Sequence, residues 1–344
     1  MVIFCWAAVR QAQDRNGQKT STVFPVAVLV GICYFTALKV KTELENISGG
    51  SDPFRKELEA RQGWRFRPGT GLLVPIPRRS KMKIKIYYLT GTGNSLVIAR
   101  HISSHFSQSE LYFIPRLMHS DGDITIEGEL VGFVFPVYFA RPPVVISEFV
   151  QRACFEGSSY IFAVINGGGL FGRSLNLFNE ELRQKGASLN AGFIINMPGN
   201  HPKIASLQRK NPEDLISSEN AKTEEIAERI KSKSNFIMKT RLGLIGHIVA
   251  LTAFQKPYRM SLRKKLDSAY WVNEKCNNCG TCQSICPADN IAYVKGKPLW
   301  HNKCINCAAC YHHCPTKAIC LDKEDPSFRY SHPLITTEEM IRQS

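Results

Sequence analysis

Residues 276–287 read C-N-N-C-G-T-C-Q-S-I-C-P, and residues 304–315 read C-I-N-C-A-A-C-Y-H-H-C-P. Each copy has the spacing C-x2-C-x2-C-x3-C-P, and the copies start 28 residues apart. Three thiolates at this spacing can hold one iron-sulfur cube, whereas the fourth, before proline, is carried by the turn to the other cube. The spacing predicts two [4Fe-4S] clusters, one held by Cys276, Cys279, Cys282 and Cys314, the other by Cys304, Cys307, Cys310 and Cys286.

Zinc and disulfides are the alternatives for these cysteines. A zinc ribbon needs only two C-x2-C pairs, which supply four ligands to one metal. It does not explain the third cysteine and the proline in each copy. Disulfides need an exporting context, which the rest of the chain supports weakly. The duplication therefore favours the double cluster. We expect His312 and His313, which stand between cysteines, to be surface residues, because the thiolates already supply every ligand.

Composition places the chain among globular proteins. Its 344 residues are enough for two domains, and hydrophobic and charged contents of 44% and 21% are ordinary. The net charge of +15 is concentrated locally: residues 228–265 hold ten Lys and Arg and one acid, Glu228. Because no nucleic-acid-binding signature accompanies this patch, we expect no nucleic-acid partner. We expect the patch, including a collar at residues 259–265, to attract an acidic redox partner protein.

The first 81 residues are predicted to be a separate extension. Residues 23–38 form an apolar run of 16 residues, short for a membrane-spanning helix, and a membrane anchor is the alternative interpretation. Residues 49–81 are rich in Gly, Pro and Arg, so we expect poor order there. Our hypothesis is that the functional protein begins at Met82 and works in the cytoplasm, because an export signal suits an oxygen-sensitive protein poorly.

From Lys83 onward, candidate strands alternate with candidate helices, which predicts an α/β fold with a doubly wound parallel sheet. Five strands suit the flavodoxin-like order. The strands are Lys83–Leu89, Leu111–Ile114, Leu130–Val137, Tyr160–Asn166 and Ala191–Met197, and the helices are Ser95–Phe106, Pro143–Ala153 and Arg173–Lys185. We predict this domain over residues 82–220, a basic helical connection over 221–266, a small α+β cluster domain over 267–326 and a tail over 327–344.

The first strand leads into a loop suited to a phosphate, formed by Thr90, Gly91, Thr92, Gly93, Asn94 and Ser95. Hydroxyls, permissive glycines and the free amides of a helix N-terminus make a phosphate cradle. A nucleoside-triphosphate loop would need Gly-Lys-Ser/Thr, and a dinucleotide fingerprint would need a third glycine where Leu96 stands. A flavin mononucleotide (FMN) phosphate fits, and an ordinary glycine-rich turn with a capped helix is the alternative.

Two further loops end at the same predicted sheet edge, where ligands of such folds bind. The third strand ends in Pro136, Val137 and Tyr138, and the fourth ends in Asn166, Gly167, Gly168 and Gly169. We predict that Tyr138 lies against the flavin ring; the alternative is an aromatic residue that covers the sheet rim.

These motifs together resemble the fused flavodoxin-ferredoxin proteins of anaerobic microbes. Residues 90–95 resemble the T-x-T-G-N-T/S loop of flavodoxins, with Ser95 in place of the commoner Thr. Residues 135–138, 167–169, 197–200 and 329–333, with the double cluster, complete a resemblance over about residues 82–333. It implies FMN and two [4Fe-4S] clusters, and no known substrate.

A chain with both cofactor types converts between one-electron and two-electron carriers. We predict an electron-transfer flavo-iron-sulfur protein, working as an oxidoreductase or as its electron-supplying partner; no catalytic residue set names a substrate. The alternatives are a redox sensor that binds an acidic partner through its basic segment, and a zinc scaffold that binds acidic polymers.

Overall fold

The computed structural model describes residues 64–66, 73–75, 80–157, 159–201, 211–239, 252, 258–259, 266–321 and 328–343. The chain divides into two compact units, Met1–Pro77 and Arg78–Ser344. In the first unit, β1 (Trp64–Phe66) pairs antiparallel with β2 (Leu73–Pro75), inside the stretch where we expect poor order. The apolar run at residues 23–38 lies outside the described residues. Within the described ranges, no helix has the length and apolar character to cross a membrane.

The second unit is built on a six-stranded parallel sheet in the order β10-β9-β8-β6-β3-β4. This is the doubly wound order in which the first strand lies next to the second and the third, so the predicted fold class is confirmed. The five predicted strands are present, and β10 adds a short sixth at the edge. The strands are β3 (Ser80–Tyr88), β4 (Phe106–Phe113), β6 (Leu130–Pro136), β8 (Tyr160–Gly167), β9 (Ala191–Asn196) and β10 (Phe236–Ile237).

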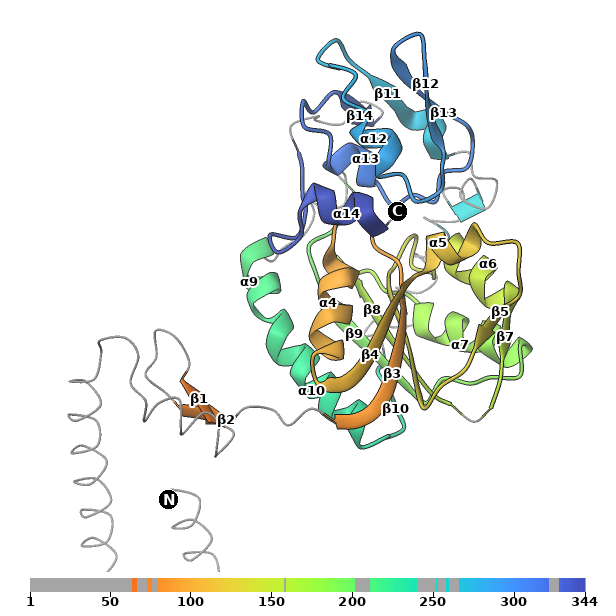
Figure 1. Ribbon diagram of the computed structural model, residues 1–344, viewed down its shortest axis with the longest axis vertical. Coiled ribbons are helices and arrows are strands. Elements are labelled where there is room, and N and C mark those ends of the chain that lie inside the picture. Colours follow the sequence, from red (N-terminus) through yellow and green to blue (C-terminus); the bar gives the residue numbers. More distant parts are fainter. Residues whose placement is uncertain are drawn as a thin grey trace, which may run out of the picture. The chain divides into compact units, whose positions relative to one another are not determined.

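Helices cover both faces of this sheet (Figure 1). On one face α4 (Asn94–Ser103) packs against α10 (Glu219–Lys231), which follows α9 (Pro212–Ser217). On the other lie α5 (Ile114–Met118), α6 (Val144–Arg152) and α7 (Ser174–Gln184). A small parallel pair, β5 (Ile124–Ile126) with β7 (Ala153–Phe155), lies outside the main sheet.

The charges of residues 221–233 predict an exposed helix at the start of the basic connection, and helix α10 differs from that expectation. Thr223, Ile226, Ala227 and Ile230 are buried, and their spacing of i, i+3, i+4 and i+7 gives the helix one face for the core. Glu219 is buried as well, whereas the other charged residues of the helix are exposed or half-buried. The helix therefore belongs to the covering layer of the sheet rather than to a connection.

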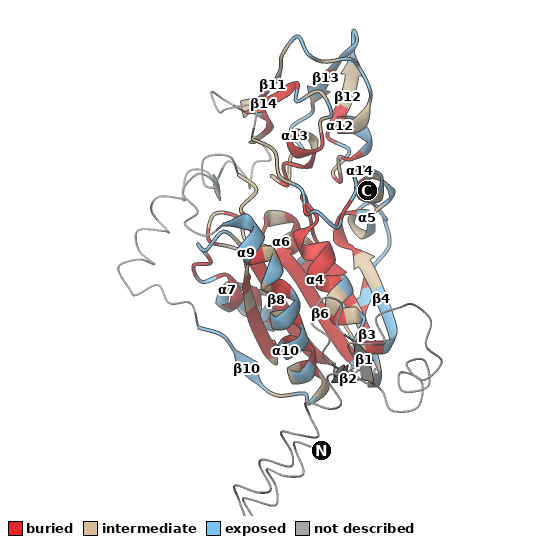
Figure 2. Cartoon of the chain, turned by 90° about the vertical axis from the view of Figure 1, so that its left-hand side faces the viewer, coloured by how far each residue is buried: buried red, intermediate tan, exposed pale blue. Residues whose placement is uncertain are grey.

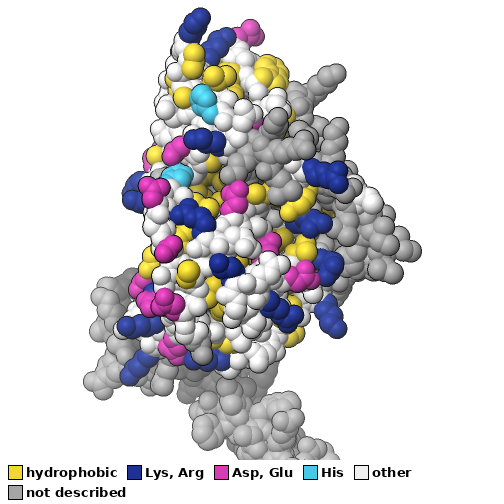
Figure 3. Space-filling model, turned by 90° about the vertical axis from the view of Figure 1, so that its right-hand side faces the viewer, with side chains coloured by type: hydrophobic (Ala, Val, Ile, Leu, Met, Phe, Trp, Pro, Cys, Tyr) yellow, Lys and Arg dark blue, Asp and Glu magenta, His cyan; other side chains and the backbone are white. Residues whose placement is uncertain are grey.

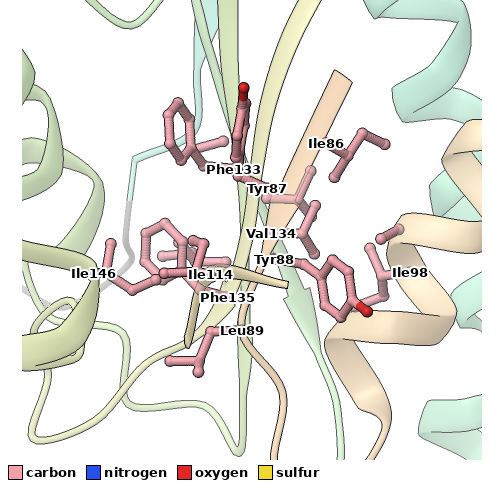
Figure 4. Close-up of a cluster of buried hydrophobic side chains, with 14 of the residues drawn as sticks. Ile86, Tyr87, Tyr88, Leu89, Ile98, Ile114, Phe133, Val134, Phe135 and Ile146 are labelled. Carbon is pink, nitrogen blue, oxygen red and sulfur yellow. The ribbon is translucent and has the colours of Figure 1, made fainter. Parts of the chain in front are cut away.

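The core is formed by the central strands, which are buried on both faces as expected of a covered parallel sheet (Figure 2). Aromatic rings fill much of it: Tyr87 stacks on Phe133 with centroids 5.7 Å apart, and Phe133 meets Phe178 edge-on at 5.1 Å. Figure 4 shows strands β3 and β6, with Ile86, Tyr87 and Phe133 directed into the packed interior. This packing fixes the strand ends from which the site loops emerge.

The cluster domain consists of two similar halves. Two antiparallel pairs frame it, β11 (Tyr270–Val272) with β14 (Ile319–Leu321) and β12 (Ile291–Val294) with β13 (Lys297–Trp300). A short helix follows each C-x2-C, α12 (Thr281–Ser284) and α13 (Ala309–His312), and a 3-10 turn, Leu266–Ala269, precedes β11. The predicted tail contains α14 (Thr337–Gln343), whose Met340 is 1% exposed. Most of residues 240–265, including the basic collar apart from Arg259, lie outside the described residues.

Candidate functional site

A cleft opens at the carboxyl edge of the sheet, where the loops after β3, β6, β8 and β9 meet. All the predicted cofactor-binding residues line this cleft except Gly93 and Gly169. The topology explains the convergence, because parallel strands end at one edge. No Asp, Glu, Lys or Arg is among the described residues that line the cleft, so it offers uncharged hydrogen-bonding groups beside apolar surface.

Hydrogen bonds to side chains fix the conformation of the loop after β3. The Thr90 hydroxyl oxygen accepts a hydrogen bond from the Gly93 amide at 3.0 Å, and Gly93 has φ of 92°, a conformation open to glycine. Asn166 donates to the Ser95 hydroxyl oxygen at 2.8 Å, which links this loop to the end of β8. The first turn of α4 contains no acidic residue, and its leading amides have no intrahelical partner. The loop therefore has the donor set and the helix dipole that suit a phosphate.

Asn94 acts in this loop as a structural bridge. Its amide nitrogen donates to the Pro198 carbonyl at 3.1 Å, and its amide oxygen accepts from the Tyr330 hydroxyl at 2.6 Å. One side chain thus ties the start of α4 to the loop after β9 and to the C-terminal segment. Nearby, the His332 amide donates to the Thr92 carbonyl at 2.7 Å, so two contacts clamp that segment to the loop.

Several cleft residues were not predicted as site residues. Phe139 and Ala140 follow Tyr138 with φ of 52° and 58°, so the loop after β6 bends in the left-handed region. Tyr138 is 7% exposed, and burial raises its pKa well above the ordinary value; its contact with a flavin ring stays a prediction. The other unpredicted lining residues are Leu170, Pro198, Gly199, Asn200, His201 and Asn306. Of these six residues, only residues 198–200 could have been predicted from the sequence, because they lie in a stretch that supports the family resemblance.

The eight cysteines form two groups with the predicted crossing. Cys276, Cys279, Cys282 and Cys314 line one small enclosed space with Tyr293 and Pro298. The thiol of Cys310 lies near those of Cys307, Cys286 and Cys304, and Cys282 of the first group is also among its neighbours. Cys314 thus joins the first three cysteines and Cys286 joins the last three, as the C-x3-C-P turns require.

Burial controls the chemistry of the second group of thiols. It raises the pKa of Cys304 to about 12 and also raises those of Cys307 and Cys310 well above the ordinary value. Such thiols lose their protons only when a strong positive charge such as iron is nearby. Among the described residues, no three His, Cys, Asp or Glu side chains are close enough to hold a single metal ion.

The second cysteine group borders the cleft. Asn306 lines the cleft, and the carbonyl oxygen of its neighbour Cys307 accepts a hydrogen bond from the Asn200 side chain at 3.3 Å. A Cβ on Gly91 would lie 2.0 Å from that same carbonyl oxygen. The phosphate-type loop and the cysteine loop therefore touch backbone to backbone, at a point where only glycine fits.

His312 and His313 are buried, which corrects the expectation that they are surface residues. The Tyr330 amide donates to His312 Nδ1 at 3.2 Å, so Nε2 carries the proton and donates to the Asn200 carbonyl at 2.5 Å. His313 Nδ1 lies 3.1 Å from the Thr337 hydroxyl. Both rings join the cluster domain to partners outside it, and burial lowers the pKa of His312 to about 3, in keeping with a neutral ring.

Comparison with known proteins points to the same stretch of the chain. Residues 275–319 match the family model of the 4Fe-4S dicluster domain, which supports iron-sulfur ligation by this part of the chain. A comparison with curated protein sequences finds no match.

Solved structures with similarity to the chain include oxidoreductases, all at low identity. They include rubredoxin oxygen:oxidoreductase from Desulfovibrio gigas (16% identity, TM-score 0.28, 46% of this chain and 38% of that one). The NAD(P)H:quinone oxidoreductase from Methanothermobacter marburgensis is 11% identical over 44% of this chain and 97% of its own, with a TM-score of 0.32. The FMN-dependent NADH-azoreductase from Bacillus anthracis, in complex with FMN, is 10% identical over 43% of this chain and 99% of its own, with a TM-score of 0.31.

Proposed function

We propose that this protein transfers single electrons between two [4Fe-4S] clusters and one FMN, and that it does so in the cytoplasm as an oxidoreductase or as the electron supplier of one. Clusters pass electrons singly, whereas a flavin takes two and releases them one at a time. The chain's contribution is to hold the cysteine groups and the cleft in fixed contact and to exclude water from between them.

The observation that carries the proposal is the contact between a cysteine ligand and the cleft wall. Asn200, a cleft residue, donates to the carbonyl of Cys307, and its own carbonyl accepts from His312. These two hydrogen bonds connect the cysteine loop directly to the cleft, and a protein whose clusters and cleft worked independently would not require that connection. The contact supports the cluster of Cys286, Cys304, Cys307 and Cys310 as the one nearest to the flavin.

The residues that would hold FMN follow from the donors at the cleft. The amides at the start of α4 and the hydroxyls of Thr90, Thr92 and Ser95 would bind the phosphate, because all are near the loop and no carboxylate opposes them. Gly167 and Gly168 allow a flat ring to approach the backbone closely. Val137 and Tyr138 supply apolar and aromatic surface on the facing loop.

The direct test is a cofactor count on one sample. The protein is purified without oxygen, and iron, acid-labile sulfide and released flavin are measured per chain. The proposal predicts about eight irons, about eight sulfides and about one FMN. Stoichiometric zinc without labile sulfide would instead support the zinc scaffold, and a cleft that stays empty after incubation with FMN would remove the flavin from the proposal.

Turnover separates an enzyme or electron supplier from a sensor. An artificial one-electron donor and a two-electron acceptor are supplied to the loaded protein. Catalytic consumption of both supports electron transfer as the function. Redox-dependent capture of a partner with no turnover supports the sensor.

A further inference from the structure

The outer end of the cluster domain presents a hairpin with two different faces. Along β12 and β13, Tyr293 and Pro298 line the space of the first cysteine group. Val294, Lys297 and Leu299 lie on the opposite face of the ladder, because side chains alternate along each strand. Val294 is 48% exposed and Leu299 is 49% exposed. The hairpin therefore covers a cluster site with one face and offers apolar surface to solvent with the other.

The turn of this hairpin reaches the cysteine loop. A Cβ on Gly296 would lie 3.5 Å from the side-chain nitrogen of Asn278, which stands between Cys276 and Cys279. Each group has one buried cysteine, Cys282 and Cys307, but only the first group has an exposed one, Cys279. The first group is thus the more accessible at Cys279, and the turn with Lys295 and Lys297 contacts its loop.

The charge around this end is positive. In residues 266–321 the lysines are Lys275, Lys295, Lys297, Lys303 and Lys317; all are exposed, and none has an ion pair with another described residue.

The acids of the same stretch largely face elsewhere. Asp267 is 3% exposed and accepts a hydrogen bond from Asn290. Asp289 pairs with His119 of the sheet domain at 3.4 Å. Glu274 is the remaining carboxylate of this stretch. In Figure 3 Lys and Arg side chains appear at the upper end of the molecule next to exposed hydrophobic ones, with acidic side chains also present there.

We propose that this surface, the turn Lys295–Lys297 with Lys275 and the Cys276–Cys279 loop, docks an acidic one-electron carrier protein. An apolar centre with a charged rim suits a small transient interface that is steered by charge. The inference rests on the proposed function. One electron passes from the reduced carrier, which is oxidised by one, to the cluster of the first cysteine group, which is reduced by one, and no bond or proton changes place.

The test uses charge reversal with a matched control. Lys295→Glu with Lys297→Glu reverses the turn, and Lys81→Glu with Lys83→Glu makes the same change in net charge at the start of β3, where both lysines are exposed at the sheet edge opposite to the cleft. The probe is a strongly acidic 2[4Fe-4S] ferredoxin, and its Kd for the loaded protein is measured without oxygen at low salt. We expect the turn variant to bind about tenfold more weakly and the control to stay within about twofold. The difference should shrink at high salt.

The experiment distinguishes failure of the docking surface from failure of the proposed function. Iron, sulfide and flavin counts and reduction by dithionite are measured on every variant, so loss of cofactors is seen apart from loss of docking. A turn variant that binds like the wild type, equal weakening in both variants, or a wild-type protein that does not bind the acidic ferredoxin would each overturn the proposal. Missing clusters with normal salt-sensitive binding would overturn the proposed function and leave the surface intact.

Discussion

Replacing Gly91 with alanine tests the contact between the sheet domain and the cluster domain. The new Cβ would lie 2.0 Å from the carbonyl oxygen of Cys307, 2.8 Å from its carbonyl carbon and 3.0 Å from its Cβ. These neighbours are mostly backbone atoms of a loop fixed by its cysteines, so a side-chain rotation cannot relieve the overlap. The two loops must move apart by roughly 1 Å, and the hydrogen bond from Asn200 to Cys307 must lengthen with them.

Forced overpacking of this kind costs about 1–3 kcal/mol. With a urea slope of about 3 kcal/mol per M, the unfolding midpoint should fall by about 0.3–1 M. Gly122→Ala is the matched control, because nothing lies within 4 Å of its Cβ position and no positive φ is involved. The control should leave the midpoint unchanged or raise it slightly, since alanine restricts the unfolded chain.

The assay is urea titration of the loaded protein without oxygen, followed by cluster absorbance and by flavin fluorescence. Gly91→Ala should release flavin at a lower urea concentration than the wild type, and it should also weaken FMN binding in buffer, because its loop forms the cradle. If Gly91→Ala matches Gly122→Ala in both midpoint and FMN affinity, the two loops are not in contact in the native protein and the reasoning fails.

Three further predictions separate the parts of the site. Cys279→Ser should lose about half of the iron while FMN remains; loss of both cofactors from folded protein would contradict two separate sites. Asn94→Ala with Ser95→Ala should lose FMN while iron remains, because the cradle loses its bridge to Tyr330 and a hydroxyl; unchanged FMN affinity would exclude this loop. Burial lowers the pKa of His332 to about 4 from 6.5, so its contribution to stability is present above pH 6.5 and is lost as the pH falls toward 4. His332→Asn, which still accepts from the Leu334 amide, should flatten that fall in urea midpoint, and a wild-type slope would refute the role.

The elements that the sequence predicted well are those with a local signal. The cysteine spacing predicted an iron-sulfur domain because a cube and a C-x3-C-P turn leave few arrangements, and residues 275–319 match a model of that kind. The loops after β3, β6 and β8 were predicted to meet because parallel strands end at one edge, and the structure brings residues 90–95, 136–138 and 166–168 together. Both inferences needed only spacing and topology.

The contacts between domains had no local signal. Asn200 meets Cys307 across 107 positions, and Tyr330 meets Asn94 across 236. His312 was expected to be exposed because it stands between two predicted cysteine ligands, where no hydrophobic periodicity indicates whether a residue is buried. It is buried only because segments distant in the sequence pack against it. Helix α10 was misread for a different reason: its charges outnumber its short apolar stripe, which weakens the amphipathic pattern.

The most direct test of the account is the kinetics of flavin reduction after a one-electron light pulse to the clusters, recorded without oxygen at several protein concentrations. Because the second cysteine group and the cleft belong to one chain and touch through Cys307, the account predicts a first-order rate that does not change with protein concentration. A rate proportional to protein concentration, or clusters that stay reduced beside an oxidised flavin, would contradict it.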